Sequence, residues 1–100
     1  MDKLRFYCWA HGCGVIPMMG KKGMYYRCRY WDYRYRPVGT RACTLTLSLS
    51  EIEELTKWVE GKDMKPGMEY IYEESNYNVY AAVTKIAGDL VAVKVKKVRR

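Results

Sequence analysis

Five residues in this chain have side chains suited to binding a metal ion or acting as a nucleophile: four cysteines and the single histidine. Thiolate and imidazole groups are ligands that zinc prefers. Two residues separate Cys8 from His11, and Gly12 follows, which is a common spacing for two ligands of one zinc ion. The candidate ligands of a structural zinc site are Cys8, His11, Cys13 and Cys28, with Cys43 as a further candidate.

The same cysteines permit three pairings into two disulfides. The chain has no Gln, two Asn and many Lys, Glu, Arg and Val, as expected at high growth temperature, where intracellular proteins can carry disulfides. We therefore predict a disulfide from Cys8 to Cys28 or Cys13, contributing about 2–4 kcal/mol, and no bound cofactor. Simple hairpin pairing would hold Cys43 about 20 Å from Cys28, too far for a bond. Zinc binding and free core thiols remain the alternatives.

A catalytic role for these residues requires more than their presence. A Cys–His nucleophile needs a histidine that faces the thiol and a third group that holds the imidazole ring. His11 lies near Cys8 and Cys13 in the sequence, but this shows only that the required residue types are present and not that they have the required geometry. We therefore favour a binding protein over an enzyme.

Residues 24–36, MYYRCRYWDYRYR, form a second group with chemical potential, because they hold five tyrosines, one tryptophan and four arginines. Guanidinium groups bind phosphate, and aromatic rings stack on exposed bases. The apolar positions change phase between Tyr30 and Trp31, which predicts a β-bulge in one strand covering the whole segment. Such a bulge would bring four arginines to one side of the sheet: Arg27, Arg29, Arg34 and Arg36.

The charge distribution favours a polyanionic partner. The formal net charge is +7, with nine Lys and Arg against two Asp in residues 1–50, three Lys against eight acids in residues 51–74, and six Lys and Arg against one Asp in residues 75–100. Two basic segments flanking an acidic one predict a basic face. The longest uncharged stretch, residues 6–20, is short and interrupted by glycine and proline, so we expect no membrane span. With no secretory signal in MDKLRFY, we expect a thermostable cytoplasmic protein of a thermophile.

Periodicity predicts the elements that must position these residues. One hundred residues suit one compact domain, covering residues 1–100. Ser48 and Glu51 fit a capping box, and Ser50 with Glu53 is a competing cap. The expected fold is α+β with a mainly antiparallel sheet or half-open barrel, in the order β-β-β-α-β-β-β. The expected elements are strands over residues 3–10, 24–36 and 43–49, a loop over 11–23, a helix over about 48–60, a strand from residue 68, and a hairpin of 77–86 with 90–98.

The hairpin register adds a second basic stripe. A two-residue turn at Gly88 and Asp89 would place Tyr80 and Ala82 on the buried face with the valines of the last strand. The opposite face would carry three lysines: Lys85, Lys94 and Lys96.

Together these patterns predict a small basic protein that binds nucleic acid, with single-stranded DNA or RNA favoured over duplex. The alternative is a protein-interaction or assembly module that forms a homodimer through tyrosine-rich faces. The predicted nucleic-acid contacts are Arg27, Arg29, Arg34, Arg36, Lys21, Lys22, Tyr25 and Trp9.

Overall fold

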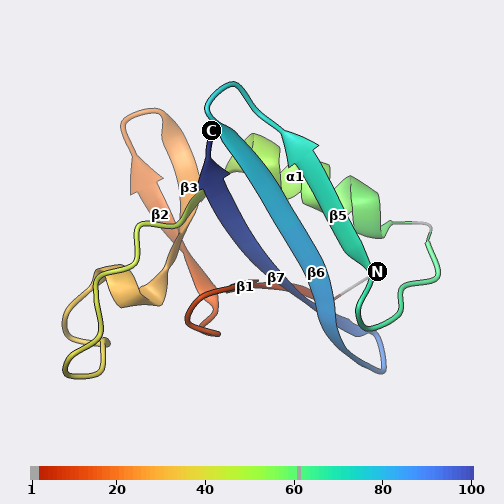
Figure 1. The fold of residues 1–100 in the computed structure, drawn as a ribbon, viewed down its shortest axis with the longest axis horizontal. Coiled ribbons are helices and arrows are strands. Elements are labelled where there is room, and N and C mark those ends of the chain that lie inside the picture. Colours follow the sequence, from red (N-terminus) through yellow and green to blue (C-terminus); the bar gives the residue numbers. More distant parts are fainter. Residues whose placement is uncertain (1–2, 61) are drawn as a thin grey trace.

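The computed structural model describes residues 3–60 and 62–100, which form one α-helix, one 3-10 helix and seven strands (Figure 1). The predicted α+β class is confirmed. Along the chain, the α-helix follows four strands and precedes the other three. The elements are β1 (Lys3–Cys8), β2 (Val15–Gly20), β3 (Gly23–Cys28), η1 (Arg29–Trp31), β4 (Thr46–Ser48), α1 (Leu49–Val59), β5 (Glu69–Glu73), β6 (Tyr77–Ala87) and β7 (Leu90–Arg99).

The strands form two sheets, which in the described part of the chain do not close into a barrel. The larger sheet has the order β1-β7-β6-β5 and the smaller one the order β2-β3-β4. All pairs are antiparallel except β1 with β7, where the first and last strands run parallel, with Leu4 opposite Val91 and Cys8 opposite Val95. Figure 1 shows α1 behind the larger sheet, so one face of that sheet is covered and the other is open.

The core lies between the larger sheet, α1 and the smaller sheet. Alternation along β7 sends every second residue inward, and these residues include Val91, Val93 and Val95, which are almost completely buried. They share one apolar cluster with Leu55 and Val59 of α1. Burying each such side chain contributes about 1.5–3 kcal/mol, so the covered face of the sheet supplies much of the stability.

The helix begins where the sequence predicts. Ser48 Oγ accepts a hydrogen bond from the Glu51 amide at 3.2 Å, and Glu51 Oε1 accepts one from the Ser48 amide at 2.7 Å. This reciprocal capping box satisfies two amides at the start of α1, and the alternative cap at Ser50 is not used.

Two predictions about the strands are wrong. Residues 15–20, expected within a loop, form β2, which pairs with β3 from Val15 opposite Cys28 to Gly20 opposite Gly23. The predicted long strand over residues 24–36 ends at Cys28, where the 3-10 helix η1 begins. The phase change at Tyr30 and Trp31 therefore reflects the end of the strand, since the strict alternation of side chains in a strand does not continue into a 3-10 turn.

A β-bulge does occur, but in β6, between Val83 and Lys85. Before the bulge, alternate residues of β6 face the core, and Tyr80 pairs with Lys96 while Ala82 pairs with Lys94. The prediction that Tyr80 and Ala82 share a face with the valines of β7 is therefore wrong, because the extra residue shifts the register by one, although Ala82 is buried at 5% relative exposure. As a result, Tyr80 shares the open face of the sheet with the two lysines.

Candidate metal centre and basic surfaces

A tight turn brings Cys8 and His11 together at the end of β1. The Cys8 amide donates to the Cys13 carbonyl at 2.8 Å, and the Gly12 amide donates to the Cys8 carbonyl at 2.8 Å. Gly12 has φ +70°, a left-handed conformation that glycine adopts without strain. The turn places His11 Nδ1 3.4 Å from Cys8 Sγ.

The other cysteines reach the same place from β3 and from the long loop that follows it. The Cys28 amide bonds the Leu45 carbonyl at 3.2 Å, and the Cys43 amide bonds the Tyr30 carbonyl at 3.3 Å, so the loop of residues 29–42 starts and ends at one point. Cys43 Sγ lies 3.5 Å from Cys8 Sγ. The result is a cluster in which one ligand atom from each of four residues lies within 4.8 Å of all the others: Cys8, His11, Cys28 and Cys43.

The predicted disulfide is not supported, because all four cysteines are free thiols. The separation of 3.5 Å between the Cys8 and Cys43 sulfurs, and that of 3.0 Å between Cys13 and Cys28, exceed the bond length of about 2.05 Å. The prediction also paired Cys8 with Cys28 or Cys13, but the Cys8 sulfur contacts that of Cys43. The expected separation of Cys28 from Cys43 is wrong as well, because the chain between them loops back instead of forming a simple hairpin.

Among the predicted zinc ligands, the structure brings together Cys8, His11 and Cys28 and adds Cys43. Cys13 lies beside Cys28 but outside this cluster, and it is only half-buried. The spacing of Cys8 and His11 signals part of the cluster in the sequence. Cys43 joins the cluster only because the loop of residues 29–42 folds back toward Cys8, and no short sequence pattern predicts that path.

Burial raises the pKa of the Cys8 thiol, against an opposing effect of the His11 and Ala10 backbone amides, which donate toward the sulfur. Burial likewise raises the pKa of the Cys28 thiol, and the Tyr30 amide opposes it. A thiol within a buried cluster is neutral unless a cation compensates its charge. The His11 ring is half-buried, with its centroid 5.3 Å from that of Tyr30.

The four predicted phosphate-binding arginines do not line one side of a strand. Arg27 is in β3, with its guanidinium 5.0 Å from the centre of the Trp31 ring, while Arg29 lies 5.7 Å from the Tyr35 ring in the exposed loop. Arg36 Nη1 donates to the Tyr30 carbonyl at 3.5 Å. These three arginines therefore have aromatic or backbone partners, and none of them belongs to an ion pair among the described residues.

Arg34 differs because it is held by a carboxylate. Its Nη2 donates to Asp32 Oδ2 at 2.6 Å, its Nε donates to both carboxylate oxygens at 3.1 Å, and its backbone amide donates to Oδ1 at 3.0 Å. The side-chain hydrogen bond from Arg34 lowers the pKa of Asp32. This pair neutralises one of the four predicted phosphate contacts.

Of the remaining predicted contacts, Lys21 and Lys22 are exposed at the turn between β2 and β3, and Tyr25 is half-buried in β3. Trp9 lies on the open side of the larger sheet, just after β1. Two ammonium groups of β7 lie over its ring, Lys94 Nζ at 4.1 Å and Lys96 Nζ at 4.6 Å from the centroid.

A basic surface therefore surrounds Trp9. The sequence predicts the lysines of β7 as a basic stripe and Trp9 as a contact, but it does not predict that the pairing of β1 with β7 brings them together. Lys96 also lies 5.2 Å from the Tyr80 ring, and the register of β1 with β7 places Tyr7 beside Lys94 and Arg5 beside Ala92. We call this surface the Trp9 face. Its members are Arg5, Tyr7, Trp9, Tyr80, Lys94 and Lys96.

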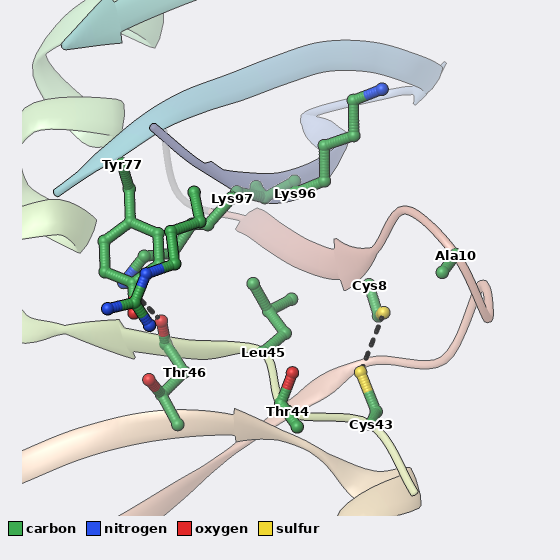
Figure 2. A pocket seen from close by; sticks show the side chains of 11 residues that line it. Cys8, Ala10, Cys43, Thr44, Leu45, Thr46, Tyr77, Lys96 and Lys97 are labelled. Carbon is green, nitrogen blue, oxygen red and sulfur yellow. Dashed lines mark hydrogen bonds between the residues drawn. The ribbon is translucent and has the colours of Figure 1, made fainter. Parts of the chain in front are cut away.

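A groove of about 500 Å³ runs between β7 and the segment that leads into β4 (Figure 2). Its lining is basic and aromatic at one end, with Lys97, Arg99 and Tyr77, where Lys97 Nζ lies 5.0 Å from the Tyr77 ring. Figure 2 shows Cys8 and Cys43 at the other end, away from Tyr77. The metal-ligand cluster and the groove thus share two residues.

Comparison of the chain with protein-family models, with curated proteins and with solved structures found no match. None of the helices described here is long and apolar enough to cross a membrane. Function must therefore be argued from the two features above, the cluster of ligand atoms and the basic surfaces.

Proposed function

We propose that the protein binds single-stranded nucleic acid on the Trp9 face, with additional phosphate contacts from the Arg-rich loop of residues 29–42. The observation that carries this proposal is the indole of Trp9 with two lysine ammonium groups close to its ring, on a sheet face that no described helix covers. Aromatic rings on an open sheet stack on bases, and flanking cations hold the phosphates on either side.

The charges on the Trp9 face are available for such contacts. Among the described residues, the ion pairs involve Arg34, Lys97 and Arg100, none of which belongs to this face. Lys94 and Lys96 therefore have aromatic partners and no carboxylate partner within the described chain. A phosphate can approach them without first displacing an internal anion.

Charge is distributed unevenly over the open face of the larger sheet. The basic residues lie on β1 and β7, whereas β5, at the opposite edge of the sheet, carries Glu69 and Glu73 on exposed positions. The open face therefore changes from positive to negative across the sheet. A polyanion is attracted to one half and repelled by the other, which favours a strand that follows β1 and β7.

Single strands are favoured over duplex because the aromatic groups lie on a sheet surface. A base must be unstacked to lie flat on Trp9 or Tyr80, and bases in a duplex are already stacked on one another. The turn of β2 and β3, with Lys21 and Lys22, and the exposed Arg99 beside the groove would extend the charged path.

The test is titration of a labelled single-stranded oligonucleotide at several salt concentrations. With four to six phosphates neutralised, log K should fall with log salt at a slope of about −3 to −4. The double variant Lys94→Glu, Lys96→Glu should abolish binding. The control Lys62→Glu, Lys65→Glu makes the same charge change at two exposed positions outside the Trp9 face and should reduce affinity far less.

Absence of binding at low salt, or equal losses in the two double variants, would contradict the proposal. Self-association that disappears in the Lys94→Glu, Lys96→Glu variant, in a protein that binds no oligonucleotide, would instead favour the assembly module. Light scattering over a range of protein and salt concentrations measures that outcome.

A further inference from the structure

We propose that Cys8, His11, Cys28 and Cys43 together bind one zinc ion, and that this ion holds both ends of the Arg-rich loop of residues 29–42. This proposal stands on the ligand atoms alone and does not rest on the proposed binding of nucleic acid. The site is drawn from three separate segments of the chain: the turn after β1, the end of β3 and the residue at which the loop returns.

The separations of the ligand atoms fit a tetrahedral ion. With Zn–S of about 2.3 Å and Zn–N of about 2.0–2.1 Å, two ligand atoms of one tetrahedral zinc lie roughly 3.6–3.8 Å apart. Cys8 Sγ lies 3.5 Å from Cys43 Sγ and 3.4 Å from His11 Nδ1. All four ligand atoms lie within 4.8 Å of one another, so small side-chain movements complete the tetrahedron.

The donor set selects a structural zinc ion. Three thiolates and one imidazole fill the four positions of zinc, which leaves none for water or substrate. On binding, the three thiols release their protons to the solvent, the ion gains three bonds to sulfur and one to Nδ1, and His11 keeps its proton on Nε2.

The loop of residues 29–42 has few apolar contacts that could hold it in place, so a metal ion at its base would have a structural role. Residues 29–42 join two of the ligands, and their side chains are mostly exposed, with Tyr33 at 76%, Tyr35 at 56% and Val38 at 106% relative exposure. The backbone hydrogen bonds within the loop are short-range turns, such as Tyr35 to Asp32 and Thr40 to Pro37. A loop with so little apolar burial needs another source of order, and a metal ion at its base provides one.

Cys13 is the matched control. Its sulfur lies 3.0 Å from that of Cys28, closer than two ligands of one zinc ion, and it is outside the four-residue cluster. The structure therefore assigns zinc binding to His11 and not to Cys13, although both follow Cys8 within five residues.

The experiment begins with elemental analysis of the full chain, purified under reducing conditions without chelator, together with titration of free thiols. One zinc per chain is expected. Cys13→Ser should keep that zinc, whereas Cys43→Ser and His11→Ala should bind it at least tenfold more weakly. Titration of the metal-free wild-type chain with Co²⁺ should produce the visible absorption bands of tetrahedral, thiolate-bound cobalt, which requires no variant to fold.

Limited trypsin digestion tests the role of the loop. The zinc-loaded chain should be cleaved slowly after Arg29, Arg34 and Arg41, and removal of the ion with a chelator should accelerate cleavage at these sites. Three results would overturn the proposal: no zinc and no cobalt bands in the wild-type chain, disulfides in place of free thiols, or loss of zinc in Cys13→Ser with retention in His11→Ala. Equal cleavage with and without zinc would overturn the role assigned to the ion in the loop.

Discussion

Lys97 Nζ lies 3.0 Å from Glu51 Oε2, so the last strand is tied to the first turn of the only α-helix in the described chain. The same ammonium donates to the Thr46 carbonyl at 3.0 Å and to Glu51 Oε1 at 3.1 Å. Because Glu51 also closes the capping box, one carboxylate serves the helix, β4 and β7 together. The side chains are nearly buried, with relative exposures of 15% for Lys97 and 6% for Glu51.

Removing Lys97 should therefore be costly. In Lys97→Met the Glu51 carboxylate stays buried without its cation, and we expect a loss of about 3–5 kcal/mol in the free energy of unfolding. The neighbouring Lys96→Met is the control, since Lys96 is exposed on the opposite face and should change stability by less than about 0.5 kcal/mol. Urea denaturation of both variants measures the difference, and similar losses would contradict it.

The two candidate caps of α1 can be separated by substitution. Ser48→Ala removes the hydroxyl that accepts from the Glu51 amide, and it should cost about 0.5–2 kcal/mol of stability. Ser50→Ala removes only an exposed contact between the two serine hydroxyls, 3.0 Å apart, and should have almost no effect. Thermal unfolding followed by circular dichroism compares the two. The opposite ranking would mean that the helix starts at Ser50.

The Asp32–Arg34 pair predicts an acid-sensitive contribution to stability. The side-chain hydrogen bond from Arg34 lowers the pKa of Asp32 in the folded state. Its stabilising effect is therefore complete above the unfolded pKa of about 3.9 and is lost as pH falls through the lower folded pKa. Asp32→Asn should thus be less stable than the wild type near pH 6, and the gap should close toward about pH 2. Urea denaturation across this range measures the gap; a gap independent of pH would contradict the assignment.

The same pair predicts that the loop arginines contribute unequally to any binding of nucleic acid. Within residues 3–60 and 62–100, the Arg29 side chain has the Tyr35 ring as its partner and no carboxylate, whereas Arg34 is already neutralised by Asp32. If each contacts a phosphate, Arg29→Ala should reduce the magnitude of the salt slope by about 0.7, and Arg34→Ala should reduce it by less. Oligonucleotide titrations of the two variants provide the comparison. A larger effect of Arg34→Ala would show that the phosphate displaces Asp32.

Features that depend on neighbours along the chain were predictable. The capping box needs only Ser48 and Glu51, three residues apart, and the inward valines of β7 follow from strict alternation. The turn at Gly88 and Asp89 is also local, with Gly88 at φ +62°. By contrast, the phase change at Tyr30 and Trp31 has two local explanations, a bulge or the end of a strand, and periodicity alone does not distinguish them.

The sequence by itself determined the α+β class, the position of the helix, the alternation of charged segments and the presence of zinc-type ligands. Each of these features depends only on composition or on residues a few positions apart. Only the tertiary structure decided which ligands meet. Cys8 and Cys43 are 35 residues apart and come within 3.5 Å because the loop after β3 returns toward the end of β1. The Trp9 face likewise requires β1 to lie parallel beside β7, a pairing of the two ends of the chain. Such contacts depend on the balance of burial over the whole fold, which no local pattern records.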